Sequence, residues 1–372
     1  MIVKILFVAH HTWSFLNFRG LLAQTIKKLD HDILVCGPEN DPELVDRIKR
    51  MGFQFHHIPM VRTGMNPLKD FMYLVRLYSL MRRESPDIVF NMAIKPVIYG
   101  SLAARLLGIS RVFSLFPGLG YSFTGENKKG AMIRALVRIL FKLSLSINQK
   151  IFFQNPDDLE TLLNSKLIGK TQAVLINGSG VDLRKFEPSE PVEAPIVFLL
   201  ISRMIRDKGI REYIEAARIV KSAYPNVQIR ILGPTDSNPT AIPLEQIQYW
   251  HEEGMIHYLG VTDDVRPMIK EASVFVLPSY REGTPRSVLE AMAMGRPIIT
   301  TDAPGCRETV SEGVNGFLVK PRDVPSLVEA MKQFIDNPGL ISQMGRKSRE
   351  LAESKFDVLK VNADVVAQMQ LY

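Results

Sequence analysis

The sequence is poor in cysteine and lacks a long apolar run. Only Cys36 and Cys306 occur among its 372 residues. This count excludes a disulfide framework and a cysteine metal cluster, and it is typical of a reducing compartment. No segment approaches the roughly 18 to 20 apolar residues of a membrane span. The apolar start runs into His10 and His11 without a small-residue cleavage site, which favours a first β-strand over a signal peptide. We therefore expect a cytoplasmic protein, attached at most to a membrane surface.

Several motifs of common ligands are also missing. The loop HHTWSFLNFRG, which follows the first apolar run, lacks the G-x-G-x-x-G pattern of a dinucleotide fold, so NAD binding loses its main support. No DNA- or RNA-binding motif is recognisable, and the aromatic residues follow amphipathic patterns more than exposed stacking ladders. The loops where ligands are expected contain no Asp-x-Asp pair. We predict no cofactor, no metal site and no nucleic-acid partner.

The charge that is present is unevenly distributed. The net charge is +7, and apolar residues make up 46% of a chain long enough for two domains. Residues 1–180 hold 23 Lys and Arg against 13 Asp and Glu, a balance of +10, whereas residues 181–372 hold 23 against 26, a balance of −3. A basic first half suggests an anionic partner such as a membrane surface or a nucleic acid.

Short apolar runs alternate with helical patterns in both halves. The helical patterns include residues 17–29 and 96–107. The runs predicted as buried strands are residues 4–10, 32–37, 87–93, 111–116, 195–202, 227–233, 255–260, 273–278 and 296–301. This alternation predicts an α/β protein with two Rossmann-like domains, each with a parallel sheet covered on both faces, and a cleft between them.

The segment 177–195 is rich in Gly, Pro and Ser and separates the two alternating systems. We therefore place a first domain at residues 1–180 and a second at 181–355. The helical pattern at 356–372 is predicted to pack back on the first domain. Ligands of parallel sheets bind at the carboxyl ends of the strands, so the loops after the strands are the candidate sites.

The segment SYREGTPRSVLEAMAMG, residues 279–295, carries two glutamates across a helix start. Thr284 is a plausible N-cap, with Pro285 as the first helical residue and Gly295 as the stop. Glu282 then lies in the loop and Glu290 in the second turn. A helix N-terminus suits a phosphate, and an ionised carboxylate accepts two hydrogen bonds from a vicinal diol such as ribose. The alternative is a capped amphipathic helix with two solvated glutamates.

Two cations follow the first strand of the second half. Arg203 and Lys208 in SRMIRDKGI could neutralise a diphosphate, although a solvated basic helix start is the simpler alternative. The turn GPTDSNP at 233–239 is another such loop.

Candidate ligand loops also occur in the first half. His10 and His11 lie at a strand end. The loop FPGLGYSFTG at 116–125, with Gly118 and Gly120, suits close approach of the backbone to a ligand, and a mobile surface loop is the alternative.

Two segments in the first half are basic and amphipathic. In residues 128–150 an apolar face is flanked by a stripe of Arg134, Arg138 and Lys142, and residues 62–83 have a similar character. Each could lie on anionic lipid, or it could be an ordinary domain helix with its apolar face in the core. Together with the charge of the first half, they favour a membrane surface as partner.

The motifs ISRMIRDKG, PSYREGTPRSVLEAMAMGRPIITTDAPGCRETV and EGVNGFLV, in this order, resemble the family-4 retaining glycosyltransferases of GT-B fold. The resemblance covers essentially the whole chain. It implies that Arg203 and Lys208 bind the donor diphosphate, that Glu290 binds the ribose and that Glu282 addresses the sugar, with Arg203, Lys208 and Glu282 as the catalytic set. The donor-binding residues are then Ser202, Gly233, Gly283, Thr284, Pro285, Arg286 and Glu290. The family commonly has Phe-Gly where Thr284 and Pro285 stand.

Within this family the chain shows a closer likeness to enzymes that extend lipid-linked glycans in bacterial N-glycosylation and O-antigen assembly. The matching stretches are FNMAIKPVIYGSLAA, FPGLGYSFTG and GPTDSNP. This likeness implies transfer of an N-acetylhexosamine such as GalNAc from a UDP-sugar to a polyprenyl-diphosphate-linked glycan on the inner face of the plasma membrane. The acceptor side would include His10, His11, Gly118 and Gly120. Many relatives carry a histidine near Lys95, which suggests that Lys95 contacts a phosphate or the acceptor instead.

The resemblance implies retention of anomeric configuration without a metal. A departing diphosphate surrounded by cations and a helix N-terminus is stabilised as its charge develops, and it can take the proton of the acceptor hydroxyl. Two other classes stay open: a nucleotide-sugar epimerase of the same architecture, which needs acid/base residues and no acceptor, and a nucleic-acid binder.

Overall fold

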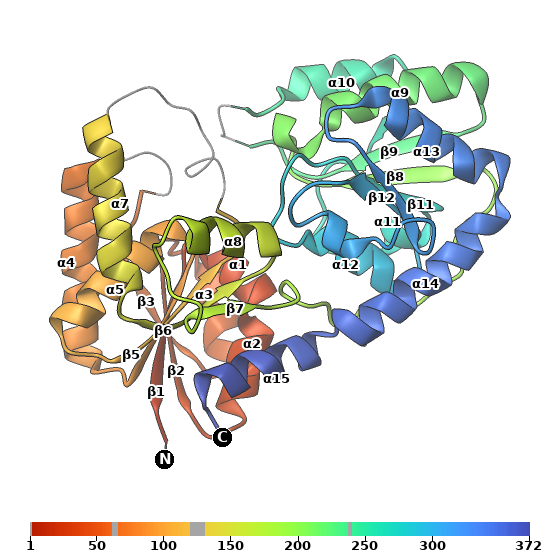
Figure 1. Cartoon of the computed structure of the whole chain (residues 1–372). Coiled ribbons are helices and arrows are strands. Elements are labelled where there is room, and N and C mark those ends of the chain that lie inside the picture. Colours follow the sequence, from red (N-terminus) through yellow and green to blue (C-terminus); the bar gives the residue numbers. More distant parts are fainter. Residues whose placement is uncertain (1, 62–65, 120–130, 237–239) are drawn as a thin grey trace. The chain divides into compact units, whose positions relative to one another are not determined.

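The computed structural model describes residues 2–61, 66–119, 131–236 and 240–372, without the side chains of 131–137. The chain forms two compact units, one comprising the residues up to Ser179 together with Val361–Tyr372, and the other comprising Gly180–Lys360. Each unit contains a parallel sheet covered by helices (Figure 1). The predicted α/β architecture with two Rossmann-like sheets is confirmed.

The first unit is built on a sheet of seven parallel strands in the order β3-β2-β1-β4-β5-β6-β7. Its strands are β1 (Lys4–Val8), β2 (Asp32–Gly37), β3 (Gln54–His57), β4 (Ile88–Met92), β5 (Arg111–Phe116), β6 (Asn148–Phe153) and β7 (Ala173–Leu175). Its helices are α1 (Thr12–Phe18), α2 (Gly20–Lys27), α3 (Pro42–Arg50), α4 (Pro67–Glu84), α5 (Ile94–Leu106), α7 (Ala131–Leu145) and α8 (Pro156–Asn164). The strand order reverses between β1 and β4, so the loops after these strands flank a switch point.

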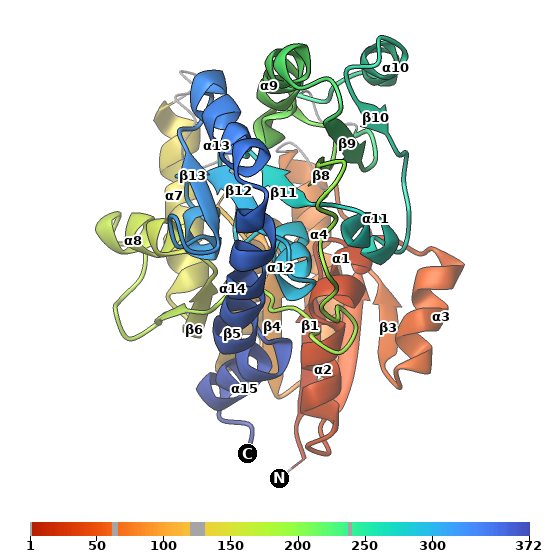
Figure 2. The same cartoon turned by 90° about the vertical axis from the view of Figure 1, so that its right-hand side faces the viewer.

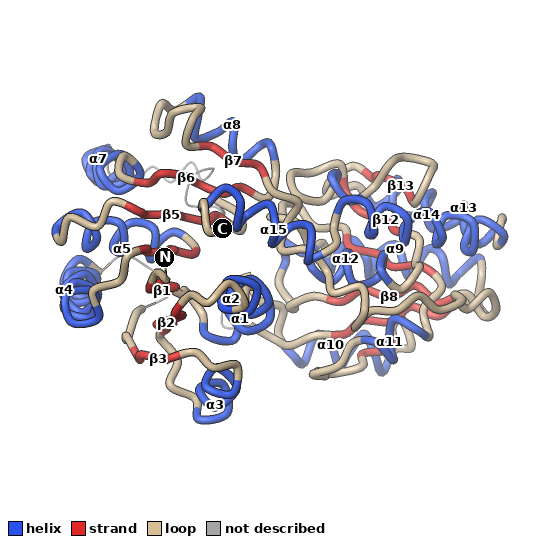
Figure 3. The backbone as a smooth tube through the Cα atoms, turned by 90° about the horizontal axis from the view of Figure 1, so that it is seen from below, coloured by secondary structure: helices blue, strands red, loops and turns tan. Residues whose placement is uncertain are grey.

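Successive residues of β1 face opposite sides of this sheet, as the pleat requires. Phe7 packs with Phe90 and Phe152 in the core under α2 and α3, whereas Leu6 packs with Leu77 of α4 on the other side. Figure 3 shows α4, α5 and α7 on one face of the sheet and α1, α2 and α3 on the other. The buried strands are therefore apolar on both faces, which is why they read as continuous apolar runs.

The second unit has a sheet of six parallel strands in the order β10-β9-β8-β11-β12-β13. The strands are β8 (Val197–Ile201), β9 (Gln228–Leu232), β10 (His257–Tyr258), β11 (Val274–Leu277), β12 (Ile298–Thr301) and β13 (Gly316–Val319). The helices are α9 (Ile210–Ala223), α10 (Leu244–Glu252), α11 (Arg266–Lys270), α12 (Arg286–Ala293), α13 (Val324–Asp336) and α14 (Gly339–Lys355), with 3-10 turns η1 (Arg206–Lys208) and η2 (Arg307–Thr309). The last helix, α15 (Val358–Met369), lies mostly in the first unit. The strand order reverses between β8 and β11.

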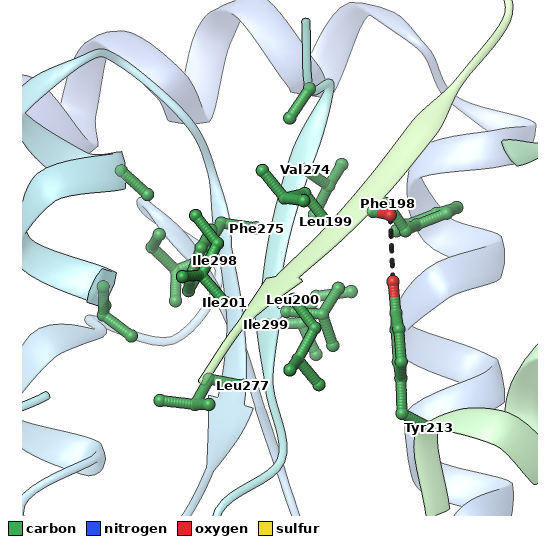
Figure 4. Packing of buried hydrophobic residues seen from close by; sticks show 14 of the residues in the cluster. Phe198, Leu199, Leu200, Ile201, Tyr213, Val274, Phe275, Leu277, Ile298 and Ile299 are labelled. Atoms are coloured by element: carbon green, nitrogen blue, oxygen red, sulfur yellow. Dashed lines mark hydrogen bonds between the residues drawn. The ribbon is translucent and has the colours of Figure 1, made fainter. Parts of the chain in front are cut away.

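The core of the second unit surrounds β8 and β11. Phe198, Phe275 and Ile298 are fully buried there, and the buried Tyr213 of α9 satisfies its hydroxyl by donating to the Phe198 carbonyl at 2.9 Å (Figure 4). Helix α12 packs beside α14 within this unit (Figure 2). Arg349 of α14 donates through Nη1 to the Ala293 carbonyl at 2.7 Å, so this packing fixes the end of α12.

Several predicted elements differ from the observed ones. The helix expected over 17–29 is two helices, because Arg19 leaves the helical region at φ −132° and ψ −7° between α1 and α2. The helix expected over 128–150 ends at Leu145, and its last residues begin β6. The strand expected over 255–260 is only two residues long, and the strands β3, β6, β7 and β13 were not predicted.

The end of the chain belongs to the core of the first unit. Val365, Val366 and Met369 of α15 and the following Leu371 are buried in the cluster that contains Phe7. Arg111 at the start of β5 donates through Nη2 to the Met369 carbonyl at 2.9 Å. The chain thus re-enters the first unit after completing the second.

Removal of the Met369 side chain tests this packing. Met369→Ala should lower the free energy of unfolding by about 2–5 kcal/mol, because the site is fully buried. Leu359→Ala is the matched control: Leu359 lies in the same helix but is half-exposed, so the change should stay within about 0.5 kcal/mol. Urea denaturation measures both, and equal effects would contradict a buried role for the end of α15.

Candidate functional site

The loops after β8 and β11 are hydrogen-bonded to each other at the switch point of the second sheet. The Asp207 carbonyl accepts from the Tyr280 backbone N–H at 2.9 Å and from Ser279 Oγ at 3.2 Å. Gly209, at φ +69°, permits this approach, because a Cβ there would lie 2.1 Å from the Pro278 carbonyl oxygen. The two loops therefore form one backbone framework.

Lys208 and Glu282 form an ion pair within this framework. Lys208 Nζ donates to Glu282 Oε1, which also accepts from Ser279 Oγ at 2.7 Å. Their side chains are 17% and 13% exposed, so the pair is largely shielded from water yet still reachable. Lys208 is thus fixed in place by a carboxylate that can itself bind hydroxyl groups.

The loop after β12 contacts the backbone of Glu282. The Glu282 backbone N–H donates to the Pro304 carbonyl at 2.9 Å. Gly305, at φ +81°, allows this packing, because a Cβ there would lie 2.2 Å from the Glu282 carbonyl oxygen. Burial raises the pKa of the adjacent Cys306 thiol to about 12, so this thiol stays protonated and is no nucleophile.

Arg203 extends the cationic side of the site. Its side chain is 52% exposed, and Nη1 donates to Asp236 Oδ2 at 2.7 Å. Ser202 lies between this arginine and β8, and Ser202 N donates to the Leu232 carbonyl at 3.1 Å. Gly233, after β9, accepts through its carbonyl from Tyr258 Oη at 3.0 Å. The loops after the neighbouring strands β8 and β9 thus place Ser202, Arg203 and Gly233 at one edge of the sheet.

The helix after Glu282 begins one residue later than predicted. Pro285 is the N-cap, with extended backbone angles of φ −70° and ψ 115°, and Arg286 is the first helical residue. Thr284 precedes the cap and is buried rather than serving as the N-cap itself. Gly295 follows the helix at φ +80°, as expected for its end.

Glu290 lies one turn further, in a different setting from Glu282. Burial raises the pKa of Glu290, and the nearby Arg286 guanidinium opposes that rise. Arg286 Nε donates to Glu290 Oε1 at 3.0 Å, while Arg286 Nη1 donates to the Gly180 carbonyl at 2.8 Å. Arg286 therefore orients the carboxylate and leaves Glu290 Oε2 outside this contact.

The acceptor-side candidates surround the switch point of the first sheet, except Gly120, which lies outside the described residues. His10 and His11 follow β1, and His11 Nδ1 lies 3.4 Å from Glu39 Oε1. Gly118 follows β5 and precedes Leu119, whose backbone N–H donates to Asp158 Oδ2 at 3.1 Å. The structure thus places His10, His11 and Gly118 at the carboxyl edge of the sheet.

Lys95 has a different environment from the one expected. Its Nζ donates to Asp70 Oδ1 at 2.7 Å and to the Val61 carbonyl at 2.8 Å, and both side chains of the ion pair are largely buried. Burial and the Asp70 carboxylate raise the pKa of the neighbouring Tyr99 to about 12. Lys95 thus anchors the first turn of α4 through a contact that the sequence motif did not reveal.

Sequence reasoning missed the supporting residues Asp70, Asp236, Ser279 and Gly305. Asp236, Ser279 and Gly305 lie in loops that were already quoted as motifs, so their position after strands was a usable signal. Asp70 carried no such signal. The described residues contain no group of three His, Cys, Asp or Glu side chains arranged to hold a metal ion.

Taken together, the second unit is an α/β domain whose switch point gathers two cations, a helix start and two carboxylates, as expected for an enzyme acting on a nucleotide diphosphate. Comparison with known proteins also indicates an enzyme of this class. Residues 195–337 match the model of glycosyl transferases group 1, and residues 4–155 match the model of glycosyl transferase 4-like domains. The chain belongs to the group 1 glycosyltransferases of family 4, retaining hexosyltransferases with the GT-B fold.

Two of the similar proteins carry names that specify undecaprenyl-diphosphate-linked substrates. The chain is 28% identical to the N,N'-diacetylbacillosaminyl-diphospho-undecaprenol alpha-1,3-N-acetylgalactosaminyltransferase of Campylobacter jejuni, over 99% of this chain and 97% of the relative. It is 25% identical to the UDP-Gal:alpha-D-GlcNAc-diphosphoundecaprenol alpha-1,3-galactosyltransferase of Escherichia coli, over 82% and 80%. Sucrose-phosphate synthase from Thermosynechococcus elongatus shares the fold, with a TM-score of 0.79 at 18% identity over 99% and 98% of the two chains.

Adding a methyl group at Gly209 tests the loop framework. Gly209→Ala should destabilise the protein by more than about 2 kcal/mol, because a positive φ and a clash with the Pro278 carbonyl combine. Gly254→Ala is the control: Gly254 has φ +68° but nothing within 4 Å of the added Cβ, so only about 1 kcal/mol is expected. Urea denaturation reports both, and equal losses would show that the close approach is unimportant.

Proposed function

We propose that this enzyme transfers an N-acetylhexosamine, such as GalNAc, from a UDP-sugar to a polyprenyl-diphosphate-linked glycan during bacterial surface-polysaccharide or glycoprotein-glycan assembly. The observation that carries the proposal is the Lys208–Glu282 pair at the β8–β11 switch point, directly before the start of α12. The two relatives whose names specify undecaprenyl-diphosphate acceptors support the acceptor class. One of these names also specifies a UDP-sugar donor.

Each group at this edge has a role toward the donor. Arg203 and Lys208 neutralise the diphosphate, assisted by the backbone of Ser202 and Gly233 and by Gly283–Pro285 at the helix start. Glu290 accepts hydrogen bonds from the ribose diol through the carboxylate that Arg286 orients. Glu282 keeps Lys208 in place and faces the transferred sugar.

The reaction follows from this arrangement of charges. The bond between the sugar's anomeric carbon and the diphosphate oxygen breaks, and UDP departs with its negative charge stabilised by Arg203 and Lys208. The acceptor hydroxyl attacks from the face that UDP leaves, which retains the anomeric configuration. The acceptor proton passes to the departing phosphate oxygen, so no side chain is needed as general base.

The first unit offers a surface for the membrane that carries such an acceptor. Four apolar side chains, spaced as one face of α4, are between 44% and 69% exposed: Leu68, Phe71, Met72 and Val75. Exposed basic residues accompany them on α4 and α7, including Lys69, Arg76, Arg138 and Lys142. The acidic residue of the first turn, Asp70, is neutralised by Lys95.

No described helix is long and apolar enough to cross a bilayer. We therefore place the enzyme peripherally on the cytoplasmic leaflet, with the α4 face against the anionic headgroups.

Loss of the Lys208 ammonium should remove stabilisation of the departing UDP. Lys208→Ala should lower kcat about 100-fold or more, measured by transfer from UDP-GalNAc to a GlcNAc-diphosphoundecaprenol acceptor. Arg211→Ala, an exposed cation in the first turn of α9, should keep the wild-type rate. Undiminished transfer by the Lys208 variant would refute the proposed role.

The raised pKa of Glu290 leads us to expect opposite effects of pH on UDP affinity and on the stability of the fold. UDP affinity should fall as the pH drops through the raised pKa of Glu290, because protonation removes an acceptor for the ribose diol. The folded pKa exceeds the ordinary value of 4.5, so the contribution of Glu290 to stability is full below 4.5 and is lost as the pH rises through the folded pKa. Glu290→Gln should bind UDP less tightly at pH 7 and lose this pH step in calorimetric titrations. An unchanged pH profile in the variant would contradict the assignment.

A separate prediction concerns membrane binding by the exposed face of α4 that Leu68, Phe71, Met72 and Val75 form. A double change, Phe71→Gln with Met72→Gln, should weaken binding to phosphatidylglycerol vesicles at least about tenfold, because each apolar side chain contributes more than 1 kcal/mol when buried. Ile219→Gln, which alters an apolar residue of similar exposure on α9, should not weaken it. Cosedimentation at low salt measures both. Equal binding by the double variant and the wild type would exclude this face.

A further inference from the structure

Trp13 is a large aromatic side chain that the donor site and the membrane face do not use. It lies in the first turn of α1, directly after β1, and 45% of it is exposed. The chain has two tryptophans, and the other, Trp250, is 9% exposed in the core of the second unit. A tryptophan left this accessible loses much of the stabilisation that burial would give it. Its position therefore suggests a role in contacting a ligand.

The indole is held by its neighbours. The His11 ring lies 6.3 Å from it at 70°, and the Phe18 ring lies 5.8 Å from it at 89°, both in edge contacts. The adjacent Thr12 is fully buried, and its backbone N–H donates to Glu39 Oε2 at 2.6 Å. Trp13 is consequently a fixed surface rather than a loosely attached side chain.

Polar groups suited to hydroxyls lie beside this surface. Glu39 also approaches His11 Nδ1 at 3.4 Å, and both side chains are about one quarter exposed. An imidazole and a carboxylate can donate to and accept from sugar hydroxyls, while an indole face packs against the C–H face of a pyranose ring. An aromatic surface with convergent polar groups is the general composition of a small-ligand site.

The location separates Trp13 from the lipid-facing surface. Helix α1 lies on the face of the first sheet opposite to α4 (Figure 3). It follows β1, whose carboxyl end flanks the switch point between β1 and β4. Ligands of such sheets bind at this edge, so a sugar, and not an acyl chain, is the occupant that the surroundings favour.

We infer that Trp13 forms a subsite for the acceptor saccharide. The indole ring lies against the pyranose ring, and His11 and Glu39 form hydrogen bonds with hydroxyl groups of the sugar. This inference rests on the proposed function, since it needs a glycan acceptor bound by the first unit. Trp13 is then a specificity-determining residue that contacts the acceptor and not the UDP-sugar.

Fluorescence tests the contact without relying on turnover. In Trp250→Phe, Trp13 is the only tryptophan, and the variant is used once its unfolding midpoint and transfer rate match the wild type. GlcNAc linked to a short prenyl diphosphate should quench and blue-shift its emission, whereas the same prenyl diphosphate without sugar should not. An equal shift from the sugar-free probe would show that lipid is the occupant, and no shift from either probe at concentrations that support transfer would refute the subsite. If the core change at Trp250 unfolds the protein, the difference between wild type and Trp13→Phe gives the same signal.

Kinetics supplies the second test. Trp13→Ala should raise KM for the prenyl-linked acceptor about tenfold, the equivalent of one stacking contact, and Trp13→Phe should recover part of this loss. KM for the UDP-sugar and its slow hydrolysis without acceptor should not change. Tyr249→Ala, which removes a similarly exposed aromatic side chain from α10, should leave acceptor KM unchanged.

The outcomes distinguish the two hypotheses. Unchanged acceptor KM in Trp13→Ala, with normal transfer by the wild type, would overturn the subsite and leave the proposed function standing. Absence of transfer to every prenyl-diphosphate acceptor tested would overturn the proposed function. In that case a Trp13 shift with methyl N-acetylglucosaminide would still support a saccharide subsite, and its absence would overturn it.

Discussion

The candidate site of the second unit depends on the ion pair between Lys208 and Glu282. Its two partners lie 74 residues apart and follow different strands, so the pair fixes the loops after β8 and β11 to each other. Because both side chains are mostly buried, removal of one partner leaves a charge with poor solvation, at a cost of about 3–5 kcal/mol. Ser279 and the close approach at Gly209 and Gly305 strengthen the same junction. If this site binds a diphosphate as proposed, its charges are oriented before the substrate arrives.

The sequence predicted the parts of the fold that depend on local pattern. Apolar runs such as 195–202 and 273–278 identified central strands because both of their faces are buried. β3, with the sequence QFHH, was missed because it is a short edge strand with polar side chains. β6 was missed because the amphipathic pattern of α7 continues into it without a Gly or Pro to mark the end. Edge position and tertiary context therefore account for most of the differences.

The candidate site shows the same division between local and distant information. The spacing of Glu282 and Glu290 around a helix start is local, and it indicated two separate positions for the carboxylates. The partners of charged groups were not predictable, because Lys95 binds Asp70 across 25 residues and Arg203 binds Asp236 across 33. For Lys95 this changes the interpretation: its ammonium is engaged in holding α4, which makes it a positioning residue for the proposed membrane face. Family membership favours transfer over epimerisation, a distinction that the loops alone left open.

The two glutamates differ in ways that argue against a shared acid/base role. Glu282 accepts hydrogen bonds from Lys208 and from Ser279. Glu290 is a buried carboxylate with a raised pKa and an arginine on one oxygen. A proton relay would require the groups to exchange a proton, but each is occupied by its own cation. The proposed charge stabilisation by Lys208 and the proposed diol binding by Glu290 need no such exchange. A retaining transfer in which the departing diphosphate accepts the proton is consistent with this separation.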